Sequence, residues 1–287
     1  MQNDILRETI TNAIIAQLEQ VSASDWDKPW FNISGEPANA VTKQPYHGIN
    51  VLWLSLSNNA VHEYATYQQW KSIGAQVKKG EHGLPIVFYK TLKVEDKNQL
   101  DEAGNPALKQ IPMLRSYTIF NCSQVEGYTP QVTPLNTIQS VAQAETFAGN
   151  CHIDTKHGGD RACFIPSINQ VNMPERGQFH DSNDYYSTLF HEYTHATGHK
   201  SRLDRDIKGR YDKESYAYEE LVAELGSAFT MAHLGLSQSP RQDHACYIKN
   251  WLQALKNDNK FIFSASAKAQ AGLDWMIAQQ QSLAIAA

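Results

Sequence analysis

The chain has 287 residues, of which 41% are hydrophobic, and it carries a formal net charge of −5. This length and apolar content allow a sizeable core and suggest two domains, while the acidic balance does not favour nucleic-acid binding through bulk charge. Without a secretory signal, a CxxC pair or an apolar run long enough to cross a bilayer, the chain is expected to be cytoplasmic, with reduced cysteines and no membrane partner.

The first part of the chain combines one helix with two strands. Residues 5–18 place their apolar side chains on one helical face and predict an amphipathic helix. Val87–Lys90 and Ser116–Phe120 have the composition of strands, and the polar stretch Glu95–Lys109 between them predicts a loop. We therefore expect a helix-led α+β domain with a small sheet.

This region is also rich in aromatic residues, namely Trp26, Trp30, Phe31, Tyr46, Trp53, Tyr64, Tyr67 and Trp70. It contains the basic turn Lys78-Lys79-Gly80 as well. Aromatic rings beside lysines suit single-stranded nucleic acid, because bases stack on rings and phosphates attract cations. Acidic residues slightly outnumber basic ones over residues 1–130, so the pattern alone favours buried aromatics.

A change in composition near residues 127–140 predicts a domain boundary. Gly127–Pro134 contains two prolines and no charged residue, which suits an extended linker. We expect one domain over residues 1–128, a linker over 129–143 and a second domain over 144–287. In the second domain, Ala162–Pro166 and Gln170–Pro174 predict two strands, either an edge that binds an extended peptide or an ordinary hairpin.

The segment with the most explicit chemistry is His191-Glu192-Tyr193-Thr194-His195. Two histidines four apart on a helix project from one face, so both imidazoles can reach one metal ion. Glu192 then lies beside that ion, where it can take a proton from a water molecule. The helix is expected to start near residues 182–184 and to end at Gly198. This HExxH arrangement is typical of zinc peptidases.

A third protein ligand is expected from a second, mostly apolar helix that starts near residue 215 and ends before residue 235. Glu220 and Glu224 are four apart within it, and a buried carboxylate is costly unless it is paired or binds a metal. The pattern Glu220-x-x-x-Glu224 resembles the gluzincin signature, and this resemblance implies Glu220 as the metal ligand and Glu224 as the support of a ligand histidine, with the reverse assignment left open. Glu219 points about 100° away from Glu220 and is expected to be solvated, or paired with a base such as Lys213.

His199 is a rival ligand, because Gly198 falls where the HExxHxxGxxH pattern of metzincins has its glycine. That pattern needs a third histidine at position 201, where this chain has Ser201. The gluzincin-type arrangement with Glu220 is therefore favoured.

The expected mechanism is metal-assisted peptide hydrolysis. Zinc lowers the pKa of a bound water molecule and polarises the scissile carbonyl. Glu192 would accept the water proton and pass it to the leaving amine. A further donor is needed near the developing oxyanion, and the candidates, each with ordinary packing as the alternative, are Tyr216, Tyr218 and His233.

Several longer segments form a pattern more specific than HExxH alone. In the N-terminal part they are Tyr46-x-Gly48-Ile49-Asn50, Tyr67-x-x-Trp70 and Val77-Lys78-Lys79-Gly80-Glu81. In the C-terminal part they are Tyr185–Glu192, Thr197-Gly198, Arg202-Leu203-x-Arg205 and Glu219–Gly226. In this order the segments resemble the ArdC-type antirestriction family of plasmids and phages, and the resemblance covers nearly the whole chain.

The resemblance implies a small α+β domain that binds single-stranded DNA, followed by a zincin-like, gluzincin-type metallopeptidase domain. It implies protection of incoming DNA from restriction, with one zinc or another divalent metal per chain and a peptide or protein as possible substrate. Together with the pairing of aromatics and lysines, it indicates seven candidate DNA contacts: Tyr46, Asn50, Trp53, Trp70, Lys71, Lys78 and Lys79. Trp53 and Trp70 fall in segments with a helical pattern, so the alternative for one or both is a place in the core, whereas Tyr46, Lys78 and Lys79 lie near turn residues and are the preferred surface contacts. The alternatives are a DNA-shielding protein with a non-catalytic zinc site and a stand-alone metal-dependent hydrolase.

Overall fold

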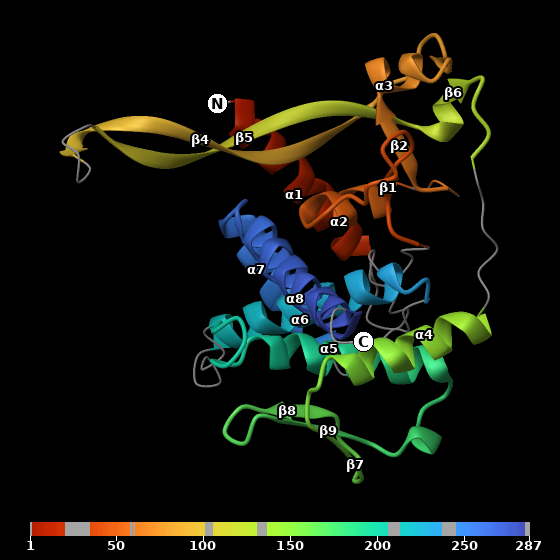
Figure 1. Ribbon diagram of the computed structural model, residues 1–287, viewed down its shortest axis with the longest axis vertical. Coiled ribbons are helices and arrows are strands. Elements are labelled where there is room, and N and C mark those ends of the chain that lie inside the picture. Colours follow the sequence, from red (N-terminus) through yellow and green to blue (C-terminus); the bar gives the residue numbers. More distant parts are fainter. Residues whose placement is uncertain are drawn as a thin grey trace.

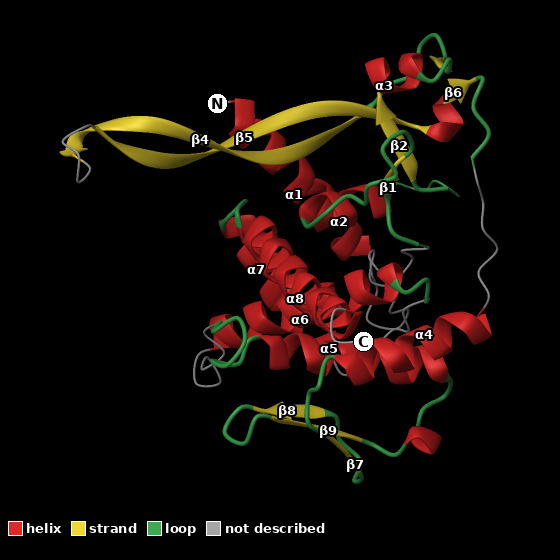
Figure 2. Cartoon of the chain, viewed as in Figure 1, coloured by secondary structure: helices red, strands yellow, loops and turns green. Residues whose placement is uncertain are grey.

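The structure is a computed structural model that describes residues 2–20, 35–57, 59, 61–100, 106–130, 137–205, 213–236 and 245–284. A sheet-containing N-terminal half lies against a mainly helical C-terminal half (Figure 1). Figure 2 shows that the strands lie toward the two ends of the molecule, with most of the helices between them. The expected α+β class with two domains is confirmed.

Within the part of the chain that the structure describes, the N-terminal half contains three α-helices and a four-stranded sheet. The helices are α1 (Gln2–Gln20), α2 (Ile49–Ser55) and α3 (Tyr67–Ser72). The sheet has the order β1-β2-β5-β4, made of β1 (Ala38–Asn39), β2 (Glu63–Thr66), β5 (Pro106–Asn121) and β4 (Leu84–Leu100). A smaller sheet pairs β3 (Gln76–Val77) with β6 (Val125–Glu126), and the short 3-10 helix η1 (Cys122–Gln124) lies between β5 and β6 in the chain.

The β4–β5 hairpin is much longer than the sequence predicts. Its strands pair antiparallel from Leu84 opposite Ile119 to Asp96 opposite Ala107, with an irregularity before Leu100 meets Pro106. The paired strands project from the body of the molecule (Figure 1). The loop expected over residues 95–109 is therefore wrong for the described residues, because a strand ladder is held by backbone hydrogen bonds that polar residues also make.

The C-terminal half contains five helices and a three-stranded sheet among the described residues. The helices are α4 (Thr137–Asn150), α5 (Ser182–Thr197), α6 (Lys213–His233), α7 (Ala245–Asn257) and α8 (Phe261–Ala284). The sheet has the order β7-β9-β8, with β7 (Thr155–His157), β9 (Gln170–Met173) and β8 (Cys163–Ile165), and η2 (Arg176–Gln178) follows it. The two expected strands are confirmed as β8 and β9, and β8 forms one edge of the sheet.

The helix that carries HExxH begins slightly earlier than expected. The side chain of Asp181 caps α5 by accepting a hydrogen bond from the Asp184 amide at 2.9 Å, and α5 ends at Gly198 as predicted. Helix α6 begins two residues before the expected start and stops before Gly235, whose φ of 65° favours glycine. Both helices therefore cover the segments that the motifs require.

One continuous core joins the two halves. Apolar side chains of α1 and α2 pack in the same cluster as those of α5, α6, α7 and α8, with α1 against α7 and α2 against α8. The Thr11 hydroxyl donates to the Asn259 carbonyl at 3.2 Å, and the Gly48 amide donates to Gln270 Oε1 at 2.9 Å. The two halves form one packed body, so the exact division at residues 129–143 stays a prediction. None of the helices in the described part of the chain has the length and apolar content needed to cross a membrane.

Candidate functional site

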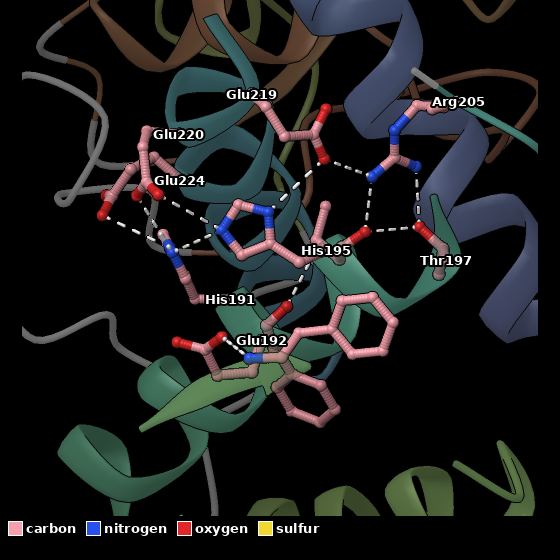
Figure 3. A network of polar contacts seen from close by, with 11 residues as sticks. His191, Glu192, His195, Thr197, Arg205, Glu219, Glu220 and Glu224 are labelled. Carbon is pink, nitrogen blue, oxygen red and sulfur yellow. Dashed lines mark hydrogen bonds and ion pairs between the residues drawn. The ribbon is translucent and has the colours of Figure 1, made fainter. Parts of the chain in front are cut away.

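Helix α5 brings the three HExxH residues to its contact with α6 (Figure 3). The i,i+4 spacing places His191 and His195 one turn apart on the same side. His191 and Glu192 are 2% and 4% exposed, and His195 is half-buried. The motif therefore lies in the interior rather than on the surface.

The two helices approach each other closely at Gly226. A Cβ atom added to Gly226 would lie 2.4 Å from the Thr194 methyl carbon, which is too short for any side chain at that position. Because α6 can come this near to α5, the Glu220 carboxylate reaches both imidazoles. Gly226 is thus a packing requirement of the site.

Three potential metal ligands converge between α5 and α6. The Nε2 atoms of His191 and His195 are 3.1 Å apart, and a Glu220 oxygen lies 3.5 Å from the first and another 3.7 Å from the second. Ligand atoms at zinc distance on a tetrahedral ion lie roughly 3.4 Å from one another. These separations fit a single small cation, and the ligand atoms all lie within 4.8 Å of one another. His199, the rival ligand, lies beyond the end of α5 and outside this group.

The charges around the histidines also fit a cation. Four buried carboxylates surround them, those of Glu192, Glu219, Glu220 and Glu224. Among the residues labelled in Figure 3, Arg205 is the one with a permanently cationic side chain. Because buried carboxylates are costly unless they are paired or bind metal, a divalent ion would stabilise this cluster.

Each of the two histidines has another carboxylate on its second ring nitrogen. A Glu224 oxygen lies 3.5 Å from His191 Nδ1, and a Glu219 oxygen lies 3.4 Å from His195 Nδ1. Of the two expectations for Glu219, a solvated side chain was wrong, because the residue is buried, whereas pairing with a base is confirmed, with Arg205 at 2.8 Å in place of Lys213. Burial raises the pKa of Glu219, but the hydrogen bond from His195 and the charge of Arg205 outweigh it, so this pKa lies below its usual value.

The Glu192 carboxylate is oriented by the edge strand β8. The Phe164 amide donates to Glu192 Oε2 at 2.8 Å. The strand that could receive an extended peptide is therefore in direct contact with the candidate base.

The structure separates the three candidates for an oxyanion donor. The Tyr218 hydroxyl shares a hydrogen bond with Ser264 Oγ of α8 at 2.7 Å. His233 lies at the far end of α6, about 20 Å along the helix from Glu220. Tyr216 lies one turn before Glu220 on α6, so the two side chains project from the same side of the helix.

Two of the three aromatic residues expected to contact DNA are packed inside the N-terminal half instead. Tyr46 and Trp70 are 5% and 0% exposed, and burial raises the pKa of Tyr46 to about 12. Trp53 is half-buried, and the indole N–H groups of Trp53 and Trp70 donate to the backbone carbonyls of Pro85 and Phe120. A base cannot stack on a buried ring, so the expectation was wrong for Tyr46 and Trp70, whose burial stabilises the fold instead. For the half-buried Trp53 a DNA contact stays a prediction. Outside the described residues lie Trp26, Trp30 and Phe31.

Asn50 is also a structural residue rather than a DNA contact. Its side-chain amide donates to the Val87 carbonyl at 2.7 Å and accepts from the Val87 amide at 3.0 Å. Asn50 thus ties α2 to β4 and is 5% exposed. The Gly48-Ile49-Asn50 segment holds elements together, with Gly48 bonded to α8 and Asn50 to the sheet.

The three predicted lysines are exposed, and two of them line a groove. Lys78 and Lys79 border a groove of about 570 Å³ together with Tyr67, whose side chain is 42% exposed. Lys71 is exposed on α3, one turn after Tyr67. Tyr67 is not among the seven candidate contacts, although the capping pattern of Thr66 with Gln69 could have placed its ring at the exposed start of a short helix.

Two family models match the chain. The N-terminal domain of anti-restriction factor ArdC matches residues 4–120, and the zincin-like metallopeptidase family matches residues 142–268. The crystal structure of the antirestriction protein ArdC from plasmid R388 in metal-free form is similar, with a TM-score of 0.78 and 33% identity over 96% of this chain and 98% of that one. Its Mn(II)-bound structure has a TM-score of 0.76 and 33% identity, covering 95% of this chain and 97% of that one.

Curated relatives match over almost the same length. The uncharacterized protein y4eC of Sinorhizobium fredii (strain NBRC 101917 / NGR234) is 42% identical over 95% of this chain and 92% of its own length. Two DNA primases TraC of Escherichia coli are 37% and 35% identical over 96% of this chain. The matched region is 20% and 27% of those longer proteins, so their activity as a whole is not carried over here.

Proposed function

Since the chain belongs to the ArdC-type antirestriction family, we propose that it protects incoming DNA by binding single strands and by cleaving peptide bonds at a zinc site. The observation that carries the proposal is the convergence of His191, His195 and Glu220 beside Glu192. A divalent metal is also supported by the R388 relative, whose structure was solved with Mn(II).

His191, His195 and Glu220 would hold the metal, which when bound supplies a Lewis acid for water and the scissile carbonyl. The Phe164 amide keeps the Glu192 carboxylate oriented, so that Glu192 can take the proton of the attacking water and deliver it to the leaving amine. Strand β8, at the edge of its sheet, would pair with an extended peptide. Tyr216 is the proposed donor to the oxyanion.

Metal content of the full chain tests the site. We expect about one zinc per chain for the parent, and loss of the metal in His191→Ala and Glu220→Ala, because each removes one of three protein ligands. Glu224→Ala should retain part of the metal, and His233→Ala, a change at the far end of α6, should retain all of it. Full metal content in Glu220→Ala would overturn the ligand assignment.

For the single strand we propose the groove beside α3. Tyr67 offers an exposed ring, while Lys78 and Lys79 line the groove and Lys71 lies next to it. Bases stack on such rings and phosphates attract lysines. Glu81 and Glu126 line the same groove, so stacking has to supply much of the affinity.

Titration of the full chain with labelled oligonucleotides tests this surface. The full chain is used because its halves share one core. We expect tighter binding of a single strand than of a duplex of the same length, and binding that weakens with salt. Equal affinity for the two forms would contradict the proposal.

A further inference from the structure

We propose that Arg205 and Glu219 act as a positioning pair that sets the tautomer and orientation of His195. The inference rests on the proposed metal site, to which it adds two residues that are not ligands. In Figure 3, Arg205 contacts Glu219, Glu219 contacts His195, and His195 in turn contacts His191. The proposal concerns how the chain prepares this imidazole for a metal.

Glu219 and Glu220 contact opposite sides of the same ring. A Glu219 oxygen lies 3.4 Å from His195 Nδ1, and a Glu220 oxygen lies 3.7 Å from His195 Nε2. Neighbouring residues of a helix point about 100° apart, which lets consecutive carboxylates reach the two nitrogens. An acceptor at Nδ1 favours the tautomer that carries its proton there, and this leaves the Nε2 lone pair toward the metal position.

Arg205 holds Glu219 in place and joins it to the end of α5. Its guanidinium donates to Glu219 Oε1 at 2.8 Å, to the Thr194 carbonyl at 2.6 Å and to Thr197 Oγ1 at 2.8 Å. Its side chain is 6% exposed, so the charge pair is buried. A planar guanidinium can make these contacts together, whereas a lysine ammonium cannot reproduce their geometry.

Arg202 provides a matched control within the same segment. It donates to the Ala196 carbonyl at 3.0 Å and to Asn169 Oδ1 at 2.6 Å. It therefore caps the same end of α5 as Arg205 does, but among the described residues its hydrogen bonds do not reach Glu219 or His195. Loss of capping alone should affect the two arginine variants in the same way.

Zinc affinity of the full chain, measured by competition with a chromogenic chelator, is the first test. Because partners of ligand histidines contribute about 10–100-fold to metal affinity, we expect losses in this range for Glu219→Ala and Arg205→Gln. Glu219→Gln and Arg205→Lys should show smaller losses, because each keeps part of the contact. Arg202→Gln should bind zinc as the parent does, and melting temperatures identify the variants that fold.

The second test reads the tautomer directly. Nitrogen-15 NMR of the metal-free full chain with labelled histidine should show His195 protonated at Nδ1 in the parent and a tautomer mixture in Glu219→Ala. An unchanged tautomer, parental zinc affinity in both Glu219 variants, or an Arg202→Gln loss equal to that of Arg205→Gln would overturn the pair. Retention of zinc by His191→Ala would instead show that the proposed metal site itself is wrong.

Discussion

The proposed metal site and the proposed groove for single-stranded DNA differ in how far the sequence alone determines the positions of their residues. In the metal site, the spacing of His191 and His195 on a helix fixes their relative position before any tertiary contact is known. In the N-terminal half, an abundance of aromatic residues does not say which rings face solvent, and Trp70 is buried while Tyr67 is exposed. Spacing within a regular element therefore constrains geometry, whereas composition does not.

The largest effect is expected at the proposed metal site and tests the role of Glu192. Glu192→Gln should lower peptide hydrolysis by about 10²–10⁴-fold while zinc content stays the same, because the base is lost and the ligands remain. Cleavage of a broad peptide library and elemental analysis check this. A variant that cleaves as fast as the parent would exclude Glu192 as base. No cleavage by the parent would favour a DNA-shielding protein with a non-catalytic site.

The next effect concerns the buried aromatics. Trp70→Ala should lower the free energy of unfolding by about 3–5 kcal/mol, because it removes a fully buried ring from a packed cluster. Urea unfolding of the full chain measures the loss. A small loss of stability together with a large loss of single-strand affinity would make Trp70 a contact residue after all and reverse the correction reported above.

A smaller effect tests how the two metal-site helices are packed. Gly226→Ala should cost about 1–3 kcal/mol of unfolding free energy, because the added methyl group overlaps Thr194. Gly149→Ala on α4 is the control, since a Cβ there meets no atom within 4 Å and should be neutral or stabilising. Combining Gly226→Ala with Thr194→Ala should recover part of the loss in thermal unfolding. Equal stability of the two glycine variants would refute the close approach.

The smallest effect is expected at the proposed DNA groove and tests the role of Tyr67. Tyr67→Ala should weaken single-strand binding by about 1–3 kcal/mol without changing the melting temperature, because a stacking surface is lost and no core is disturbed. Ile73→Ala is a matched control, since Ile73 is also 42% exposed but does not line the groove. Fluorescence anisotropy with a labelled strand checks both variants. Equal losses in the two would remove Tyr67 from the proposed surface.

What the sequence predicted well depended on regular geometry. The helix around His191, the apolar helix around Glu220 and the strands β8 and β9 could all be predicted, because each rests on local periodicity. Glu219 and Glu220 do reach different atoms, since their carboxylates lie at the two nitrogens of His195. The partner of Glu219, however, is Arg205, a residue that follows α5 in the chain and contacts both Glu219 and the end of α5.

The remaining misses share a cause. The length of the β4–β5 hairpin depends on backbone pairing, which polar residues do not prevent. The role of Asn50 depends on Val87, a residue 37 positions away that local patterns cannot connect to it. Tertiary partners decided these features, and one sequence without its fold does not identify such partners.

The common core of α1, α2 and the C-terminal helices bears on how such a gene can recombine. A breakpoint between β6 and α4 would produce two fragments, each exposing to water the apolar residues that it contributes to that core. A gene fusion is therefore expected to acquire both halves of the chain together, in one step. The two Escherichia coli primases agree with this expectation, because each contains a counterpart of 96% of this chain within a far longer protein.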